Sequence, residues 1–367
     1  MRLLEDHGKR LFREYGLRVP RGRTVTTPEE VDHIAGPMVL KALVPVGGRG
    51  KAGGVLKAAT VEEARSAARR LLGMNIKGFR ARSVLIEEET PMSREIYLSL
   101  TVDRSSGLPA LLASPQGGVD IESLPDSAIA RWTIHPFLGV QPHLVREAAK
   151  ALGLQEYRDD LEEVLTSVWA LFRAMDCELV EINPLALTDG GELVAADSKV
   201  IINDDALFRH PELGSQEQGV EGLEAEARSK DISFVSLDGD IGVIANGAGL
   251  TMATLDEIAL RGGRGGAFLD LGGTDDPAKV EEAFKLMARA GPKAVLLNIF
   301  GGITKCDTVA QGVVGAMGRL DHHFPLVARI RGVNEEKARQ MLRDHGIASH
   351  LDLEEAVREA VALEAGK

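Results

Sequence analysis

The densest chemical signal in the sequence is a run of glycines that carries two cations. Residues 47–54 read Gly-Gly-Arg-Gly-Lys-Ala-Gly-Gly, and Lys41 stands shortly before them. Glycine backbone can bring its N–H groups close to phosphate oxygens, and a lysine adds a point charge for the same oxygens. The run therefore predicts a phosphate-binding flap, although a flexible hairpin with solvated charges has the same composition.

Two well-known nucleotide motifs do not fit this run. Residues 48–53 satisfy G-x-G-x-x-G, but the dinucleotide motif needs a helix directly after its glycines, and residues 55–59 predict a strand. A Walker A loop needs Ser or Thr after its lysine and Gly five residues before the Gly-Lys pair. Here Ala52 follows the lysine, and Pro45 stands at the other position.

Two hard oxygen ligands come late in the first half of the chain. Asn183 follows a predicted strand at 177–182, and Asp197 ends another at 193–197. Their oxygens are of the type that Mg²⁺ takes, with water and phosphate completing its shell. Adjacent antiparallel strands could present both to one ion. A simple Asn-Pro turn and a strand-end Asp are the structural alternative, which the neighbouring phosphate flap makes less attractive.

Glycines recur in the second half at the ends of apolar strands. Strands are predicted at 241–245, 267–271, 294–300, 326–330 and 347–350, and a helix is predicted after each of them. Near-continuous apolar strands alternating with helices indicate a parallel sheet covered on both faces. Five such units predict a flavodoxin-like, doubly wound domain. Turns such as 246–249 and 301–302 would open helix N-termini, which suit a phosphoryl or carboxylate group.

The first half mixes helices and strands in an α+β pattern with antiparallel pairing. Helices are predicted at 3–15, 61–72, 144–152 and 161–175, and strands at 38–44, 55–58, 84–87, 95–102 and 108–113. Thr60 and Glu63 form a capping box before the second helix. A weakly apolar segment at 211–230 predicts a linker or surface helix. We therefore expect domains at 1–230 and 231–367.

Composition excludes several classes of protein. Lys plus Arg is 43 and Asp plus Glu is 55, which gives a net charge of −12 and argues against a general nucleic-acid binder. No apolar run approaches the roughly 18 residues of a membrane span, and the first residues lack the apolar stretch of a signal peptide. The only two cysteines, Cys177 and Cys306, match no zinc spacing and favour a reducing, cytoplasmic setting.

Together these motifs resemble one family over essentially the whole chain. The similar segments, in order, are Lys41 with 47–54, 180–185 (Val-Glu-Ile-Asn-Pro-Leu), 205–209 (Asp-Ala-Leu-Phe-Arg), 246–250 and 298–303. They look like the β subunits of succinyl-CoA synthetases. The resemblance implies an N-terminal ATP-grasp domain with a lid at about 21–90, followed by a flavodoxin-like domain. It also implies ATP or ADP and Mg²⁺, succinate, and an α subunit that carries the CoA site and a phosphorylated histidine.

The resemblance also implies a role for each matching residue. Nucleotide would be bound by Lys41, Gly48, Arg49, Gly50, Glu87, Thr90 and Glu95. Magnesium would be ligated by Asn183 and Asp197. Substrate would be contacted by Asn246, Gly301, Gly302 and Ile303. Glu181 would orient the partner's histidine and would be the catalytic residue of this chain. No Ser-His-Asp or Cys-His arrangement is evident in the sequence, which fits a nucleophile that comes from another chain.

Departures from the family pattern affect the expected substrate more than the expected reaction. Pro45, Gln116 and Ser198 stand where the family usually has other residues, and 273–275 (Gly-Thr-Asp) replaces a Gly-Gly-Gly-Ala type of loop. Ligation of a related acid, malate or citrate, therefore stays open, as does a non-catalytic nucleotide-sensing subunit. Pro20, near the expected nucleotide edge, resembles ADP-forming relatives and predicts adenine over guanine.

Overall fold

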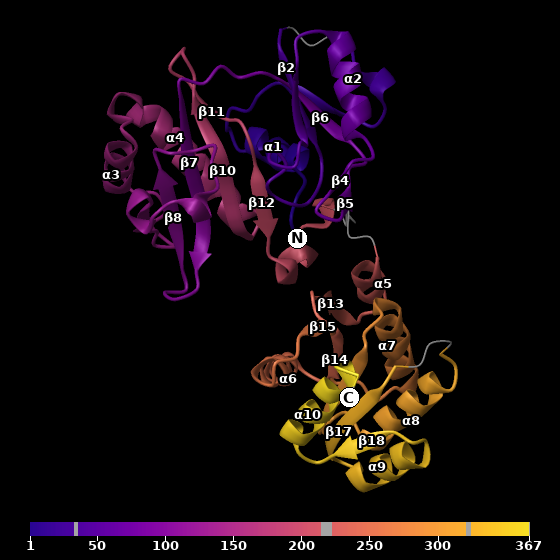
Figure 1. Cartoon of the computed structure of the whole chain (residues 1–367). Coiled ribbons are helices and arrows are strands. Elements are labelled where there is room, and N and C mark those ends of the chain that lie inside the picture. The colour runs from indigo at the N-terminus through magenta and orange to yellow at the C-terminus, as the bar shows by residue number, and fades with distance from the viewer. Residues whose placement is uncertain (33–35, 214–221, 321–323, 367) are drawn as a thin grey trace. The chain divides into compact units, whose positions relative to one another are not determined.

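A computed structural model describes residues 1–32, 36–213, 222–320 and 324–366, and the chain divides into two compact units, 1–219 and 220–367 (Figure 1). The short helix α5 (Leu223–Ser229) groups with the second unit. Residues 214–221 of the expected linker lie outside the described residues, and the domain boundary at 230/231 stays a prediction. None of the described helices has the length and apolarity needed to cross a membrane.

The larger sheet of the first unit is wholly antiparallel. Its strands run in the order β11-β10-β7-β8-β9, and β12 pairs with β10. Their bounds are β7 (Arg94–Asp103), β8 (Leu108–Ser114), β9 (Ala130–Thr133), β10 (Cys177–Leu187), β11 (Leu193–Ala195) and β12 (Lys199–Ile202). Helices α1 (Glu5–Glu14), α3 (Pro142–Leu152) and α4 (Arg158–Ala174) contribute to the core that forms on this sheet. The predicted antiparallel α+β architecture is confirmed.

A smaller sheet in the same unit carries the glycine run. Its order is β1-β6-β2-β3, with bounds β1 (Gly22–Val25), β2 (Met38–Ala42), β3 (Val55–Ala58) and β6 (Val84–Glu88). Helix α2 (Val61–Leu71) packs on it, and a two-residue pair, β4 (Asn75–Ile76) and β5 (Phe79–Arg80), follows. Thr60 caps α2 by accepting from the Glu63 N–H at 3.2 Å. The Glu63 carboxylate accepts from the N–H of Ala59 rather than from that of Thr60. The predicted capping box is therefore present with its second hydrogen bond shifted by one residue.

The second unit is built on a mostly parallel sheet in the order β13-β15-β14-β16-β17-β18. The strands are β13 (Ser233–Ser236), β14 (Ile241–Ala245), β15 (Gly265–Asp270), β16 (Ala294–Gly301), β17 (Leu326–Gly332) and β18 (Ala348–His350). The five parallel strands follow the 2-1-3-4-5 order of a flavodoxin-like sheet, as predicted. Strand β13 was not predicted and pairs antiparallel with β15 at the edge.

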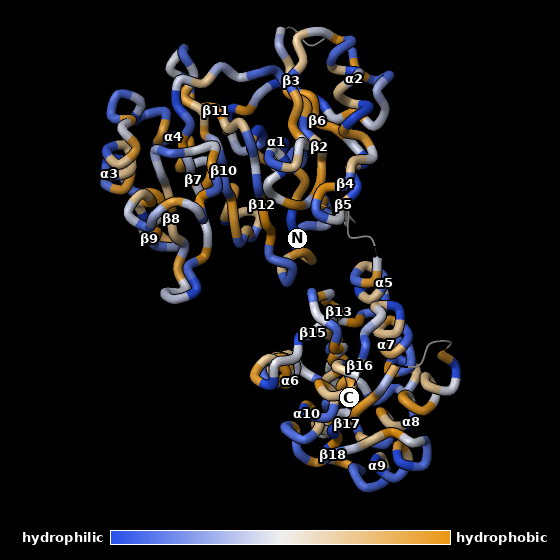
Figure 2. Tube along the Cα trace, in the orientation of Figure 1, coloured by the Kyte–Doolittle hydropathy of each residue, from blue (hydrophilic) through white to orange (hydrophobic). Residues whose placement is uncertain are grey.

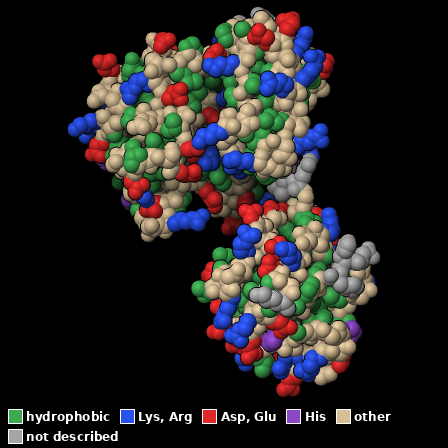
Figure 3. All heavy atoms as spheres, viewed as in Figure 1, with side chains coloured by type: hydrophobic (Ala, Val, Ile, Leu, Met, Phe, Trp, Pro, Cys, Tyr) green, Lys and Arg blue, Asp and Glu red, His purple; other side chains and the backbone are tan. Residues whose placement is uncertain are grey.

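Helices cover both faces of this sheet. Apolar side chains of α7 (Pro277–Ala290), α8 (Cys306–Met317) and α9 (Glu335–Asp344) form one core, and those of α6 (Ala248–Leu260) and α10 (Leu353–Glu364) form another. Figure 2 shows apolar residues along the central strands of each unit and hydrophilic residues on the outer loops. Acidic and basic side chains are interspersed over the face seen in Figure 3.

Two sequence-based expectations about local structure are wrong. Strand β10 does not end at Ile182 but continues through Asn183 to Leu187, with a change of register against β7 between Ile182 and Leu185. Strand β11 ends at Ala195, so Asp197 lies between β11 and β12 rather than at a strand end. The consequence is that Asn183 is held within a sheet, where its side chain has a fixed direction.

Candidate active site

The glycine run forms the turn that joins β2 to β3, as predicted. The turn is closed by bonds from the Gly54 N–H to the Arg49 carbonyl at 2.8 Å and from the Ala52 N–H to the Gly48 carbonyl at 3.3 Å. Gly48 has a φ of +77°, a backbone conformation that favours glycine. Within the described part of the chain, the N–H groups of residues 47–51 have no hydrogen-bond acceptor. A row of unpaired N–H groups is suited to an anion.

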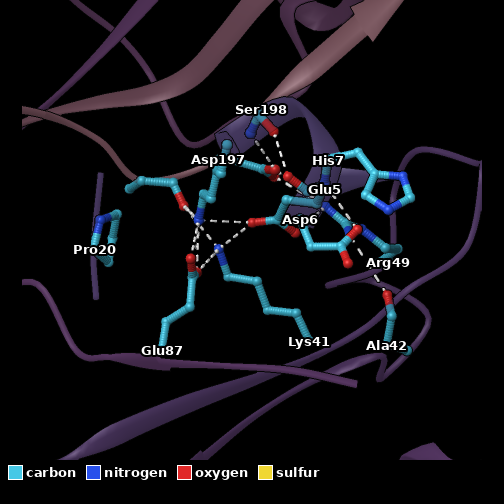
Figure 4. A network of polar contacts seen from close by, with 12 residues as sticks. Glu5, Asp6, His7, Pro20, Lys41, Ala42, Arg49, Glu87, Asp197 and Ser198 are labelled. Atoms are coloured by element: carbon cyan, nitrogen blue, oxygen red, sulfur yellow. Dashed lines mark hydrogen bonds and ion pairs between the residues drawn. The ribbon is translucent and has the colours of Figure 1, made fainter. Parts of the chain in front are cut away.

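The two cations expected to bind phosphate, Lys41 and Arg49, belong to an ionic cluster (Figure 4). The Lys41 ammonium lies 2.6 Å from Oε1 of Glu5 and donates to the Ala196 carbonyl at 2.7 Å. The Arg49 guanidinium lies 2.7 Å from Oε2 of Glu5 and 3.1 Å from Oδ1 of Asp197. Glu5 on α1 therefore contacts both cations that were expected to bind phosphate.

Lys9, one turn after Glu5 on α1, completes the cluster. Its ammonium donates to both oxygens of Glu87, at 2.7 and 2.6 Å, and to the Ala196 carbonyl at 2.7 Å. Glu87 also lies 3.0 Å from Lys41. Lys9 and Glu87 are each only 1% exposed. The cluster of Glu5, Lys9, Lys41, Arg49, Glu87 and Asp197 thus balances three carboxylates against three cations, as groups taken out of water require.

The charges in this cluster are strongly coupled. Burial opposes ionisation of Glu5, but Lys41, Lys9 and Arg49 outweigh it and hold the pKa of Glu5 well below its usual range. Burial likewise opposes the charge on Lys41, but Glu5 and Glu87 outweigh it and raise the pKa of Lys41. Both groups are therefore charged at neutral pH, and each stabilises the charge of the other.

A cavity of about 1170 Å³ lies between the flap and the larger sheet. Seven predicted site residues line it, namely Lys41, Gly48, Arg49, Gly50, Glu181, Asn183 and Asp197. The loop 118–123 also lines the cavity, and an ion pair between Lys51 and Asp120 joins the flap to that loop. The structure therefore brings the flap, the expected metal ligands and the expected catalytic carboxylate around one space.

Three of the residues predicted to bind nucleotide do not line this cavity. Glu87, Thr90 and Glu95 are not among the residues that line this cavity. Glu87 is enclosed in the ionic cluster, and Glu95 is exposed, with its carboxylate packed against the backbone of Gly118. Their assignment to nucleotide binding stays a prediction.

The expected metal ligands and Glu181 are positioned by β10 and its neighbours. The Asn183 amide accepts from the Gly118 N–H at 2.7 Å and donates to the Val119 carbonyl at 2.9 Å, which fixes its orientation. Asp197 accepts from the Ser198 N–H at 2.7 Å, in addition to its contact with Arg49. Glu181 lies 3.3 Å from the Lys199 ammonium across the β10–β12 pair. All three side chains are thus held by neighbours in the same wall of the cavity.

Several residues of this site were missed in the sequence. Glu5 and Lys9 could have been found from the sequence, because they lie on the buried face of α1 with Leu11 and Phe12. Charged residues at i and i+4 on the apolar face of a helix indicate a buried ion pair. Arg2 also lines the cavity, but no local pattern distinguishes it from a surface arginine.

The predicted substrate residues lie in the second unit, at the carboxyl ends of its parallel strands. Asn246, after β14, exchanges two hydrogen bonds of 2.9 Å with the backbone of Phe300, at the end of β16. Gly301 is enclosed, and a Cβ there would lie 2.5 Å from the sulfur of Cys306. Gly302 is open and Ile303 is 83% exposed. The two loops meet where strand order reverses, which is where open α/β sheets bind ligands.

Comparisons with known proteins agree with this architecture. Residues 2–187 match the ATP-grasp domain, and residues 244–363 match the CoA-ligase domain. The beta subunit of ADP-forming succinate–CoA ligase from Desulfurococcus amylolyticus is 45% identical over 100% of both chains, and the one from Chloroflexus aurantiacus is 41% identical, also over 100% of both. The structure of ATP citrate lyase from Methanothrix soehngenii, in complex with citrate and coenzyme A, has a TM-score of 0.74 at 20% identity. It covers 100% of this chain and 99% of that chain, and it shows the same fold. Because these relatives are 41–45% identical over the whole of both chains, the chain belongs to the beta subunits of ADP-forming succinate–CoA ligases.

Proposed function

We propose that the cavity of the first unit binds ATP or ADP through its phosphates and that this chain transfers a phosphoryl group to a histidine of an α subunit. The observation that carries the proposal is the row of unpaired N–H groups at 47–51 beside the buried cations Lys41 and Arg49. Such a site would bind the phosphates through hydrogen-bond donors and position them, without forming a covalent bond, which is what phosphoryl transfer needs from a protein.

The oxygen ligands that line the cavity fit Mg²⁺. Asn183 and Asp197 both line it, and both offer the oxygen atoms that this ion prefers. Bound there with the nucleotide, Mg²⁺ would neutralise charge on the phosphate oxygens. Glu181 would accept a hydrogen bond from the incoming imidazole, and the hydrogen bond from Lys199 at 3.3 Å would hold that carboxylate in position. The chain's own groups thus bind and orient, while the nucleophile comes from the partner.

In the net reaction, ATP, succinate and coenzyme A give ADP, phosphate and succinyl-CoA. The proposed order is activation of the acid as an acyl phosphate, with the phosphoryl group passing between nucleotide and the partner's histidine. Asn246, Gly301, Gly302 and Ile303 would contact the substrate in the second unit. The close relatives at 41–45% identity are succinate–CoA ligases, which favours succinate over malate or citrate. The two cysteines are free thiols, which suits a cytoplasmic location.

Coexpression with an α subunit tests the proposed function. The purified complex should form a CoA thioester only when nucleotide, Mg²⁺ and an acid are all present, and succinate should give a higher kcat/KM than malate or citrate. ATP should give a higher kcat/KM than GTP, in keeping with Pro20. A complex that binds nucleotide but forms no thioester with any of these acids would instead indicate a sensing subunit.

A further inference from the structure

We propose that Arg2 binds the phosphoryl group that is being transferred, at the end of the cavity where Glu181 lies. This inference rests on the proposed function, because it assigns a residue to the same phosphoryl transfer. Arg2 lines the cavity, yet neither the flap motif nor the resemblance pointed to it.

The two expected phosphate cations have little capacity left for a new anion. The three ammonium donors of Lys41 face Glu5, Glu87 and the Ala196 carbonyl, at 2.6, 3.0 and 2.7 Å. Arg49 lies against the carboxylates of Glu5 and Asp197. Their charge is largely offset within the cluster, so a phosphate that approaches the flap needs additional positive charge.

Arg2 is a cation of this cavity without such a partner. Among the described residues, no carboxylate forms an ion pair with it, whereas Lys51 and Lys199 on the same walls are each paired. Burial and the neighbouring Arg49 lower its pKa, and Glu181 and Asp197 oppose that effect from a distance. A partly buried guanidinium with no counter-ion is poised to take an anion, and its planar fork matches phosphate geometry.

The sheet register places Arg2 on the same face as Glu181. Arg2 forms an antiparallel bridge with Ile201 of β12, and the Leu3 N–H donates to the Val200 carbonyl at 3.0 Å. On the other side of β12, Lys199 lies opposite Glu181 of β10. Residues directly opposite in an antiparallel pair point to the same face, and so do residues two apart in one strand. Arg2, Ile201, Lys199 and Glu181 therefore share one face.

The guanidinium at the end of the Arg2 side chain lies next to the flap. A Cβ built on Gly47 would lie 3.6 Å from Nη2 of Arg2. The guanidinium thus lies beside the unpaired N–H groups that begin at Gly47. Its backbone bridges to β12, which in turn pairs with β10, the strand that carries Glu181. Charge on the transferring phosphoryl group spreads over its three equatorial oxygens in the transition state. Arg2 is placed to stabilise that charge between the flap and the incoming imidazole.

The test compares Arg2→Gln and Arg2→Lys with the wild-type chain, each assembled with an α subunit. Arg10→Gln is the matched control, since Arg10 is 52% exposed on α1 and lies only near Glu14, at 4.0 Å. Single-turnover phosphorylation of the α histidine by saturating Mg-ATP gives the transfer rate, and calorimetry with Mg-ADP gives nucleotide affinity. Thermal unfolding of each variant checks that the fold is kept.

We expect Arg2→Gln to slow transfer by about 100-fold, the loss typical for removing one donor to a transition-state charge, with Mg-ADP affinity changed by less than about threefold. Arg2→Lys should recover part of the rate, because it keeps the charge but not the fork. A wild-type rate in Arg2→Gln would overturn the inference, as would a loss of nucleotide affinity with an unchanged saturated rate. Failure of the proposed function is distinct, because the wild-type complex itself would then transfer no phosphate.

Discussion

The ammonium of Lys41 lies 2.6 Å from Oε1 of Glu5, a contact that ties strand β2 of the smaller sheet to helix α1. Through Glu5 and Lys9 the same helix also contacts Arg49 of the flap and Glu87 of β6. One buried turn of helix therefore holds β2, the flap and β6 together beside the cavity.

Replacing Glu5 with Gln should strongly destabilise the first unit. It removes one of three carboxylates from the cluster and leaves the cations Lys9, Lys41 and Arg49 underneutralised in a buried site. Breaking a buried ion pair typically costs about 3–5 kcal/mol. Urea unfolding at pH 7 measures this cost. Glu14→Gln, at a 57% exposed position of the same helix, should cost less than about 1 kcal/mol; equal costs for the two variants would show that the cluster contributes no special stability.

Replacing Asp197 with Asn should weaken binding of the Mg²⁺–nucleotide complex and lower turnover. The change removes one anionic oxygen ligand, and we expect affinity to fall by roughly tenfold or more, equivalent to about 1.4 kcal/mol. Titration of Mg²⁺ at fixed ADP measures the effect in the assembled complex. Asp189→Asn, in the exposed turn after β10, is the control. Wild-type activity of Asp197→Asn at limiting Mg²⁺ would refute the metal assignment.

The sequence predicted the helices and strands of the fold better than the residues of the site. Apolar alternation predicts β7 and β8 of the first unit to within a residue or two. In the second unit nothing local marks β13, three of whose four residues are exposed. Arg49 and Asn183 could be proposed for the cavity because each lies in a local sequence motif. Glu5 and Lys9 could have been found from the pattern of α1. Arg2 could not, because it is placed by its bridge to Ile201, far along the chain.

Asp307 provides a pH-dependent contribution to the stability of the second unit. Hydrogen bonds from Lys337 at 2.8 Å and from Asn334 at 2.9 Å lower the pKa of Asp307 to about 2. Because the folded-state pKa lies below the unfolded value of about 3.9, the stabilisation is full above pH 4 and is lost as pH falls toward 2. The free-energy difference between wild type and Asp307→Asn should therefore shrink between pH 5 and pH 3. Asp256→Asn, at an exposed position of α6, should show no such trend; a constant difference for Asp307→Asn would contradict the pairing.

Neither cysteine should react in the native chain. Burial raises the pKa of the Cys177 thiol to about 12, and burial also raises the pKa of Cys306. Both side chains are buried, so a reagent has no access to either sulfur in the folded chain. A thiol-specific reagent at pH 8 should label no cysteine in the folded chain and two after denaturation. Rapid labelling of Cys306 in the native chain would show that this region opens readily.

The division of labour between this chain and its partner is the central claim, and transfer of labelled phosphate tests it most directly. The chain is incubated with γ-labelled ATP and Mg²⁺, alone and with an α subunit, and the subunits are then separated. We expect acid-labile label on α only, and a much slower appearance of that label with Glu181→Ala at unchanged ADP affinity, because in the proposed mechanism Glu181 would orient the histidine. Acid-labile label on this chain in the absence of α would contradict the account.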